Sequence, residues 1–316
     1  MVSYGADVSR TWVDIVRTDN SRQCKSYDRI ANERTALEAY WRAEQDIRPT
    51  LQVTVESTGL YQLTLVRTCL RLGIAVRLIN PILTKRLTQT SVRKTKTDQK
   101  DAHRIALLGL ERAGYPVVEE QLSQTKFYLR ASSKLANLSR TLQATRTHYE
   151  LAGVPASSLD ETFGACQLAL QQASKQLQAQ GVAGCNVADM QLLQSIPGIG
   201  PVTAARIHAE IGDVRRFRHA KQLIAYAGLD PSVHSSGNTI RLGKLTKRGS
   251  PHLRHAFFIA ASVARRYDPE LRMVYERKRA EGKAYTQAVT HVARLMVYRV
   301  YAIWSRGTPF VKKGDG

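Results

Sequence analysis

The spacing of hydrophobic residues divides the chain into three parts. Up to about residue 115, short runs rich in β-branched and aromatic residues alternate with stretches of helical spacing. Strands are predicted over residues 2–6, 11–17, 22–27, 51–56 and 74–79, and helices over 30–44, 61–72 and 98–110. Hairpins come first and crossovers follow. We therefore expect an α/β domain with a mixed sheet and helices on its faces.

The pattern becomes helical in the second part of the chain. Between residues 121 and 180 leucines recur at spacings of three, four and seven, as at Leu135, Leu138 and Leu142. This spacing predicts a coiled-coil hairpin broken near residues 153–155, and a plain helical linker explains it equally well. From residue 189 onward the pattern predicts a mostly helical domain, with helices over 202–211, 220–228, 251–267, 269–282 and 285–304.

Length and composition agree with this division. A chain of 316 residues is long enough for two domains and a connecting element. We assign residues 1–115 to the α/β domain, 116–188 to the helical connector, 189–306 to the C-terminal domain and 307–316 to a flexible tail. There is no apolar run of about 18 residues, no signal-peptide pattern at the start and no closely spaced cysteine pair. These features predict a cytoplasmic protein with no membrane partner.

Charge is the most informative feature of the composition. The chain has 47 Lys and Arg against 26 Asp and Glu, a net charge of +21, and residues 57–97 and 231–267 contain no acid at all. Such stretches favour contact with nucleic-acid phosphates, with a merely basic protein as the alternative. Binding to a membrane surface would need an amphipathic helix with apolar anchors, which these stretches lack. The candidate phosphate contacts are Lys94, Lys96, Arg241, Lys244, Lys247, Arg248 and Arg254.

A glycine-rich turn separates two predicted helices in the C-terminal domain. Residues 196–201 read Ile-Pro-Gly-Ile-Gly-Pro, which is typical of a helix–hairpin–helix motif. In that motif Gly198 and Gly200 would let a phosphate approach the backbone and the amides of the following helix. The alternative is an ordinary turn between two helices.

Four acidic residues occupy special positions in the α/β domain. Asp7 ends the first predicted strand and Glu56 the fourth, while Asp98 and Asp101 share one face at the start of a helix. We expect the first and fourth strands to be neighbours, which would bring these carboxylates together. Their repulsion calls for a divalent cation, and oxygen donors suit Mg²⁺, with Mn²⁺ as the substitute. Each acid alone is equally a turn or cap residue, but the set follows the order of a ribonuclease H-like, RuvC-type nuclease fold.

A serine-rich loop in the C-terminal domain is the second candidate for chemistry. Ser235, Ser236 and Gly237 have the composition of a turn and lie between basic residues. A serine hydroxyl needs a base, or a metal-bound phosphate as its target, to act as a nucleophile. Asp230 and His234 are the only local candidates for the base. Without such help the loop has no chemical role.

Five motifs together carry a resemblance to a known family. They are Gly5-Ala-Asp7-Val-Ser9, Glu56-Ser-Thr-Gly59, Lys96-Thr-Asp98-Gln-Lys-Asp101-Ala102, Ile196-Pro-Gly-Ile-Gly200, and Ala227-Gly-Leu-Asp-Pro231 followed by Ser236-Gly237. In this order they resemble the DEDD-type insertion-sequence transposases of the IS-one-ten family, with its IS-eleven-eleven group, and are similar to the Piv-type pilin-gene invertases. Ala6 and Arg10 depart from the residues usual in the family, and neither change removes a metal ligand.

The resemblance implies a mechanism that spacing alone does not. It implies an N-terminal RuvC-like domain, a coiled-coil connector and a C-terminal transposase domain. Asp7, Glu56, Asp98 and Asp101 would hold the metal, and Ser236 would form a transient phosphoserine link to DNA. Ser235 and Ser250 are second choices for the nucleophile. It further implies DNA as substrate, a structured non-coding guide RNA, a dimer or tetramer whose protomers share the active site, and a prokaryotic, nucleoid-associated protein.

Two other functions stay open at this point. One is a RuvC-like nuclease that uses water to cut DNA junctions, with a purely structural serine loop. The other is a nucleic-acid-binding protein whose acidic cluster is a relict.

Overall fold

The computed structural model describes residues 2–57, 61–79, 83–84, 97–111, 114–117, 124–153, 157–236, 239–247 and 249–311. The chain forms two compact units, Met1–Glu119 and Glu120–Gly316. The finer boundaries expected at residues 188 and 306 stay predictions, and half of the expected tail, from residue 312, lies outside the described residues. In the described part of the chain, none of the helices combines the length and the hydrophobicity of a membrane span.

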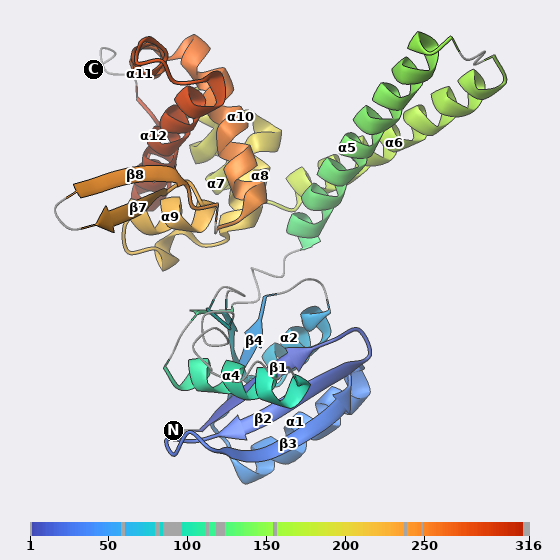
Figure 1. Ribbon diagram of the computed structural model, residues 1–316, viewed down its shortest axis with the longest axis vertical. Helices are drawn as coiled ribbons and strands as arrows, with labels where there is room; N and C mark the ends of the chain where they lie inside the picture. Colours follow the sequence, from blue (N-terminus) through green and yellow to red (C-terminus); the bar gives the residue numbers. More distant parts are fainter. Residues whose placement is uncertain are drawn as a thin grey trace. The chain divides into compact units, whose positions relative to one another are not determined.

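The first unit is built on a mixed sheet with the strand order β3-β2-β1-β4-β5-β6 (Figure 1). The strands are β1 (Ser3–Val8), β2 (Trp12–Thr18), β3 (Cys24–Ala31), β4 (Gln52–Glu56), β5 (Ala75–Ile79) and β6 (Tyr115–Pro116). The first three form an antiparallel meander, and β4 continues the sheet parallel to β1, followed by β5 parallel to β4. This order confirms the predicted mixed sheet and the ribonuclease H-like fold. The short strand β6, antiparallel to β5, was not predicted.

Three helices cover this sheet, α1 (Arg34–Ile47), α2 (Gln62–Arg71) and α4 (Asp98–Leu110). The first was predicted to begin at residue 30. Instead β3 continues to Ala31, which pairs with Trp12, so the helix begins at Arg34. On one sheet face Trp41 of α1 packs edge-on against Tyr4 of β1, with ring centroids 5.4 Å apart. The opposite face of β1 carries α4 (Figure 1).

Helix α4 lies unusually close to β1. A Cβ atom added to Gly5 would lie 2.1 Å from the backbone nitrogen of Ala106 and 2.2 Å from the carbonyl oxygen of Ala102. One added to Gly109 would lie 2.2 Å from Ser3 Oγ and 2.4 Å from Thr54 Oγ1. The absence of a side chain at these two glycines therefore allows the short distance between α4 and the sheet.

The second unit begins with a helical hairpin, in which α5 (Gln124–Leu151) and α6 (Ser157–Ala183) run side by side (Figure 1). A globular part follows, with α7 (Val187–Gln194), α8 (Pro201–Ile211), a 3₁₀ turn (Val214–Arg216), α9 (Ala220–Ala227), β7 (Pro231–Ser236), β8 (Thr239–Leu245), α10 (Pro251–Tyr267), α11 (Pro269–Ala280) and α12 (Tyr285–Arg306). The five helices predicted after residue 200 are present, whereas α7, the 3₁₀ turn and the β7–β8 hairpin were not predicted.

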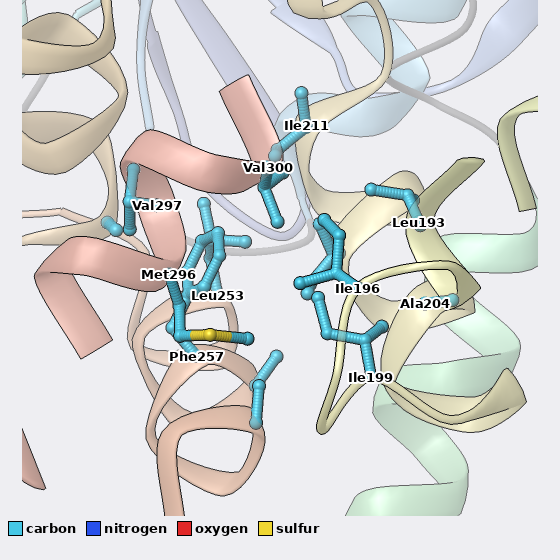
Figure 2. Packing of buried hydrophobic residues seen from close by; sticks show 14 of the residues in the cluster. Leu193, Ile196, Ile199, Ala204, Ile211, Leu253, Phe257, Met296, Val297 and Val300 are labelled. Atoms are coloured by element: carbon cyan, nitrogen blue, oxygen red, sulfur yellow. The ribbon is translucent and has the colours of Figure 1, made fainter. Parts of the chain in front are cut away.

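The core of the second unit lies between α8, α10 and α12. Figure 2 shows Ile196 and Ile199 of the turn before α8 close to Leu253 and Phe257 of α10 and Met296 of α12. Helix starts are well defined by sequence, because α10 and α11 combine a side-chain cap with proline in the first turn. Ser250 Oγ accepts a hydrogen bond from the Leu253 amide at 3.2 Å, and Asp268 accepts one from the Leu271 amide at 3.0 Å.

The close contact between α4 and β1 generates a stability prediction. We expect Gly5→Ala to lower the free energy of unfolding of the first unit by about 3 kcal/mol, because the new methyl group overlaps helix backbone that cannot turn aside. Calorimetric unfolding measures the change. Gly164→Ala, inside α6 with nothing within 4 Å of the new Cβ, is the control and should stabilise by about 0.5–1 kcal/mol. Wild-type stability of Gly5→Ala would contradict the close packing.

Candidate active site

The four predicted carboxylates lie at the ends of β1 and β4 and in the first turn of α4. Parallel pairing of Ala6 with Val55 places Asp7 of β1 beside Glu56 of β4. Because side chains alternate along a strand, Ser3, Gly5 and Asp7 face α4. That helix starts at Asp98, where Thr97 Oγ1 caps it by accepting a hydrogen bond from the Lys100 amide at 3.3 Å. The first turn of α4, with its acids, therefore lies over the end of β1.

Each of the other three acids affects the pKa of Asp7. Burial, and to a smaller extent the negative charges of Asp101, Glu56, Asp98 and Asp14, together raise the pKa of Asp7 from 3.8 to about 6. A carboxyl group in such surroundings is stabilised by a proton or a cation. The edge of the sheet is therefore a cation-attracting site.

Three of the acids have partners within the protein. Glu56 accepts a hydrogen bond from Thr84 Oγ1 at 2.7 Å. Asp98 accepts one from Arg29 Nη2 at 2.6 Å, and Asp101 accepts one from Arg104 Nη1 at 2.6 Å. Among the described residues, no three His, Cys, Asp or Glu side chains converge as metal ligands.

The chemistry of the donor set nevertheless fits a divalent cation. All four groups are carboxylates, the ligands that hard cations prefer, and the groups named above as shifting the pKa of Asp7 in the described part of the chain are all acidic. The acids would bind such a cation by exchanging their arginine and threonine partners for it.

Two residues of this site were missed by sequence reasoning. Asp14 of β2 lies directly across the strand pair from Asp7 and is only 4% exposed. It accepts hydrogen bonds from Tyr27 Oη at 2.6 Å and Arg29 Nε at 2.8 Å. Arg29 thus links this buried acid to Asp98. The available signal was a lone acid within the buried run Val-Asp-Ile-Val of residues 13–16.

The predicted glycine turn lies between α7 and α8, as a helix–hairpin–helix motif requires, and its two glycines differ. A Cβ on Gly198 would lie 2.6 Å from the backbone nitrogen of Ala264, so this residue is glycine for packing against α10. Gly200 is exposed, with nothing within 4 Å of such a Cβ, and it directly precedes the first residue of α8. Only Gly200 therefore leaves the backbone open to a ligand.

The predicted nucleophile Ser236 is the last residue of β7, paired with Thr239 of β8. It thus ends a strand, where a turn was expected, and Gly237 lies outside the described residues. The base of this hairpin is fixed, since Thr246 Oγ1 donates to Asp230 Oδ1 at 2.6 Å and the Thr246 amide donates to the Asp230 carbonyl at 3.0 Å. Asp230, a candidate base, therefore has a structural partner.

Other predicted residues have defined contacts or lie outside the description. Ser250 caps α10 and also donates to Glu210 Oε2 at 3.0 Å. Arg254 donates to the carbonyl of Ala227 at 3.2 Å, a contact within the protein. Lys247 is exposed with a positive φ of 51°. Arg241 and Lys244 lie on β8, while Lys94, Lys96 and Arg248 lie outside the described residues.

The strand order and the acidic edge together define a protein of the ribonuclease H-like class. A family model described as the IS116/IS110/IS902 family of transposases matches residues 190–276, and a model for DEDD transposases of the IS110 type matches residues 4–150. Together they cover most of the chain. The chain belongs to this transposase family, which confirms the predicted resemblance.

Individual proteins agree with this assignment. The pilin gene-inverting protein of Moraxella bovis is 28% identical over 84% of this chain and 83% of its own length. A protein of insertion element IS110 from Streptomyces coelicolor is 38% identical over 37% of this chain, and the match spans only 29% of that relative. RuvC of T. thermophilus, solved with a Holliday junction substrate, covers 37% of this chain and 99% of its own, at 12% identity and a TM-score of 0.30. A likeness at that score carries no argument, and the fold assignment rests on the strand order.

The raised pKa of Asp7 predicts how stability depends on pH. In metal-free protein the folded state keeps the Asp7 proton up to about pH 6, whereas the unfolded chain releases it near 3.8. The contribution of Asp7 to stability is therefore present at low pH and lost as the pH rises from about 4 to about 6. We expect Asp7→Asn to abolish this loss and, at neutral pH, to exceed the wild type by about 1–2 kcal/mol, a figure reduced for solvent screening.

Calorimetric unfolding in a chelator across this pH range measures the effect. A divalent cation should then raise the unfolding temperature of the wild type more than that of Asp7→Asn. Equal stability of the two proteins at neutral pH, without metal, would contradict the crowding of carboxylates around Asp7.

Proposed function

We propose that this protein is a DNA transposase or recombinase of a mobile insertion sequence. The observation that carries the proposal is that Asp7 ends a strand beside Glu56 and is affected by the charges of Asp98 and Asp101, in a ribonuclease H-like unit. These four residues would hold Mg²⁺, or Mn²⁺ in its place. When bound, the cation neutralises charge on a DNA phosphate and makes the phosphorus a better electrophile.

The chain's own part in the reaction is assigned to Ser236. Its Oγ attacks the scissile phosphorus, an Oγ–P bond forms, and the bond between phosphorus and a sugar oxygen breaks. The hydroxyl proton passes to a base, and the departing sugar oxygen takes up a proton. A DNA hydroxyl later attacks the phosphoserine, which restores the serine and joins the new strand. This exchange conserves phosphodiester bonds and needs no external energy source.

The basic surface is assigned to nucleic acid. Lys94, Lys96, Gly200, Arg241, Lys244, Lys247 and Arg248 are the proposed contacts, together with Gly198 and Arg254, whose described contacts are internal. We propose DNA ends and target as substrates and a structured non-coding RNA as guide. We further propose a cytoplasmic, nucleoid-associated homo-oligomer, a dimer or tetramer, whose protomers share serine and acids. The net charge of +21 supports a large polyanionic partner.

Covalent trapping tests the nucleophile. Wild-type protein incubated with element-end DNA and Mg²⁺, then denatured, should carry a covalent DNA adduct, because the phosphoserine bond survives denaturation. Ser236→Ala should lose the adduct entirely. Ser235→Ala, the neighbour on β7, is the matched control and should retain it. An adduct in Ser236→Ala would remove this residue from the role.

Ser250→Ala completes the comparison. It removes the α10 cap and should cost about 1 kcal/mol of stability while the adduct still forms. Metal-dependent cleavage without any adduct in the wild type would establish the alternative, a RuvC-like nuclease that uses water. Loss of cleavage in Asp7→Ala is expected under both mechanisms.

Purification tests the guide RNA. Protein isolated under mild conditions from cells that carry the whole element should contain one discrete RNA protected from nuclease. Protein with no bound RNA would contradict the guide and leave the serine chemistry untouched.

A further inference from the structure

Helices α8 and α10 pack together along a seam, and α5 contacts α8 at one end of it. Gly198, before α8, packs against Ala260 and Ala264, late in α10. Glu210, near the end of α8, meets Ser250 at the start of α10. The two helices therefore run antiparallel, with the middle of α8 opposite the second turn of α10. Helix α5 joins the seam through Arg130, which bonds to Glu210.

At one end of this seam the positive charges are neutralised from within. Glu210 is 4% exposed and accepts two hydrogen bonds from Arg130, at 2.6 Å from Nε and 2.8 Å from Nη2. Lys126 Nζ lies 3.8 Å from its Oε2. Burial opposes ionisation of this carboxyl, but the bond from Arg130 and the charge of Lys126 keep its pKa below the ordinary value. Cations in this seam are thus balanced by a carboxylate.

One helical turn earlier, no carboxylate of the described residues is paired with a cation in this way. Arg206 lies on the same face of α8 as Glu210, and its Nε is buried without a hydrogen-bond partner among the described residues. Burial lowers the pKa of Arg206, which indicates that its charge is poorly solvated.

A histidine and a further arginine lie within electrostatic reach. Partial burial lowers the pKa of His255, on α10, and the positive charges of Arg206 and Arg140 lower it further. Arg140, on α5, donates only to oxygens of the neutral groups Asn137 and Ala136 in the described contacts. His255 and Arg140 are exposed, so the cluster is open to a ligand.

We propose that Arg206, His255 and Arg140 form a binding site for a backbone phosphate of nucleic acid. A phosphate would supply the negative charge that Glu210 supplies one turn away. Guanidinium groups present paired donors that match its oxygens, and a histidine beside them adds a third donor. The proposal rests on the proposed function in that the ligand is nucleic acid, and it adds a site on the α5–α8–α10 seam, away from Ser236 in the sequence.

The test compares arginines that have a carboxylate partner among the described residues with arginines that have none there. Arg206→Gln and Arg140→Gln remove cations of the cluster. Arg146→Gln, also on α5, removes one that is paired with Glu150 and Asp160 at 3.1 Å each. Binding of a fluorescently labelled DNA duplex, and separately of a structured RNA, is measured by anisotropy at several salt concentrations.

We expect each cluster variant to bind about tenfold more weakly and to reduce the slope of log affinity against log salt by about one, with Arg146→Gln unchanged. The thermal midpoint of Arg206→Gln should equal or exceed that of the wild type, because an unpaired, poorly solvated cation has been removed. Affinity and slope unchanged in Arg206→Gln would overturn the proposal. So would weaker binding matched by lower stability, or a change of oligomeric state with nucleic-acid affinity retained, which would assign the cluster to a second copy of the chain.

The DNA and RNA measurements identify the source of the phosphate. The site binds the nucleic acid whose affinity falls in the cluster variants. Failure of this site is distinguishable from failure of the proposed function. If wild-type protein binds neither nucleic acid, both fail. If the wild type binds and forms its DNA adduct while Arg206→Gln behaves identically, only the phosphate site is wrong. At saturating DNA, Arg206→Gln should still form the Ser236 adduct.

Discussion

The candidate active site depends on how closely α4 can approach β1. Ser3, Gly5 and Asp7 alternate on one face of the strand and meet successive turns of the helix, from Gly109 down to Asp101. Any side chain at Gly5 would overlap helix backbone, so the approach is possible only with glycine there. The raised pKa of Asp7 is the electrostatic consequence of this contact. The packing of Gly5 against the middle of α4 thus determines how near the acids at the start of α4 lie to Asp7.

Both units use arginine to stabilise buried carboxylates. Arg29 pairs with the buried Asp14 and also with the exposed Asp98, Arg130 pairs with Glu210, and Arg299 pairs with Asp268. A buried ion pair costs desolvation that good hydrogen bonding only partly repays, so such pairs specify position more than they add stability. In the first unit the arginines hold acids that have another proposed use. In the second they join helices, as Arg130 joins α5 to α8.

The sequence could predict what depends on order and periodicity. Hairpins followed by crossovers were enough to make β1 and β4 neighbours, and hence to bring Asp7 beside Glu56. The features that were not predicted depend on contacts between residues far apart in the sequence. The role of Arg29 needs the β2–β3 register, and the role of Gly198 needs the position of α10. The β7–β8 hairpin was missed because its strands are rich in Ser, His, Gly and Lys, which read as a loop when packing is unknown.

The hairpin geometry limits how the proposed nucleophile could be activated. Asp230 precedes β7 and Ser236 ends it, so the extended strand separates them by about 20 Å. Asp230 is also hydrogen-bonded to Thr246. It therefore cannot take the serine proton, and the side chain of His234 lies outside the described residues. Meanwhile Arg254 and Arg294 hold the carbonyls of Ala227 and Leu229, just before β7, which fixes the strand at the end away from the serine. In the proposed reaction the proton of Ser236 must therefore pass to a group other than Asp230, because the strand that separates the two residues is held at the Asp230 end.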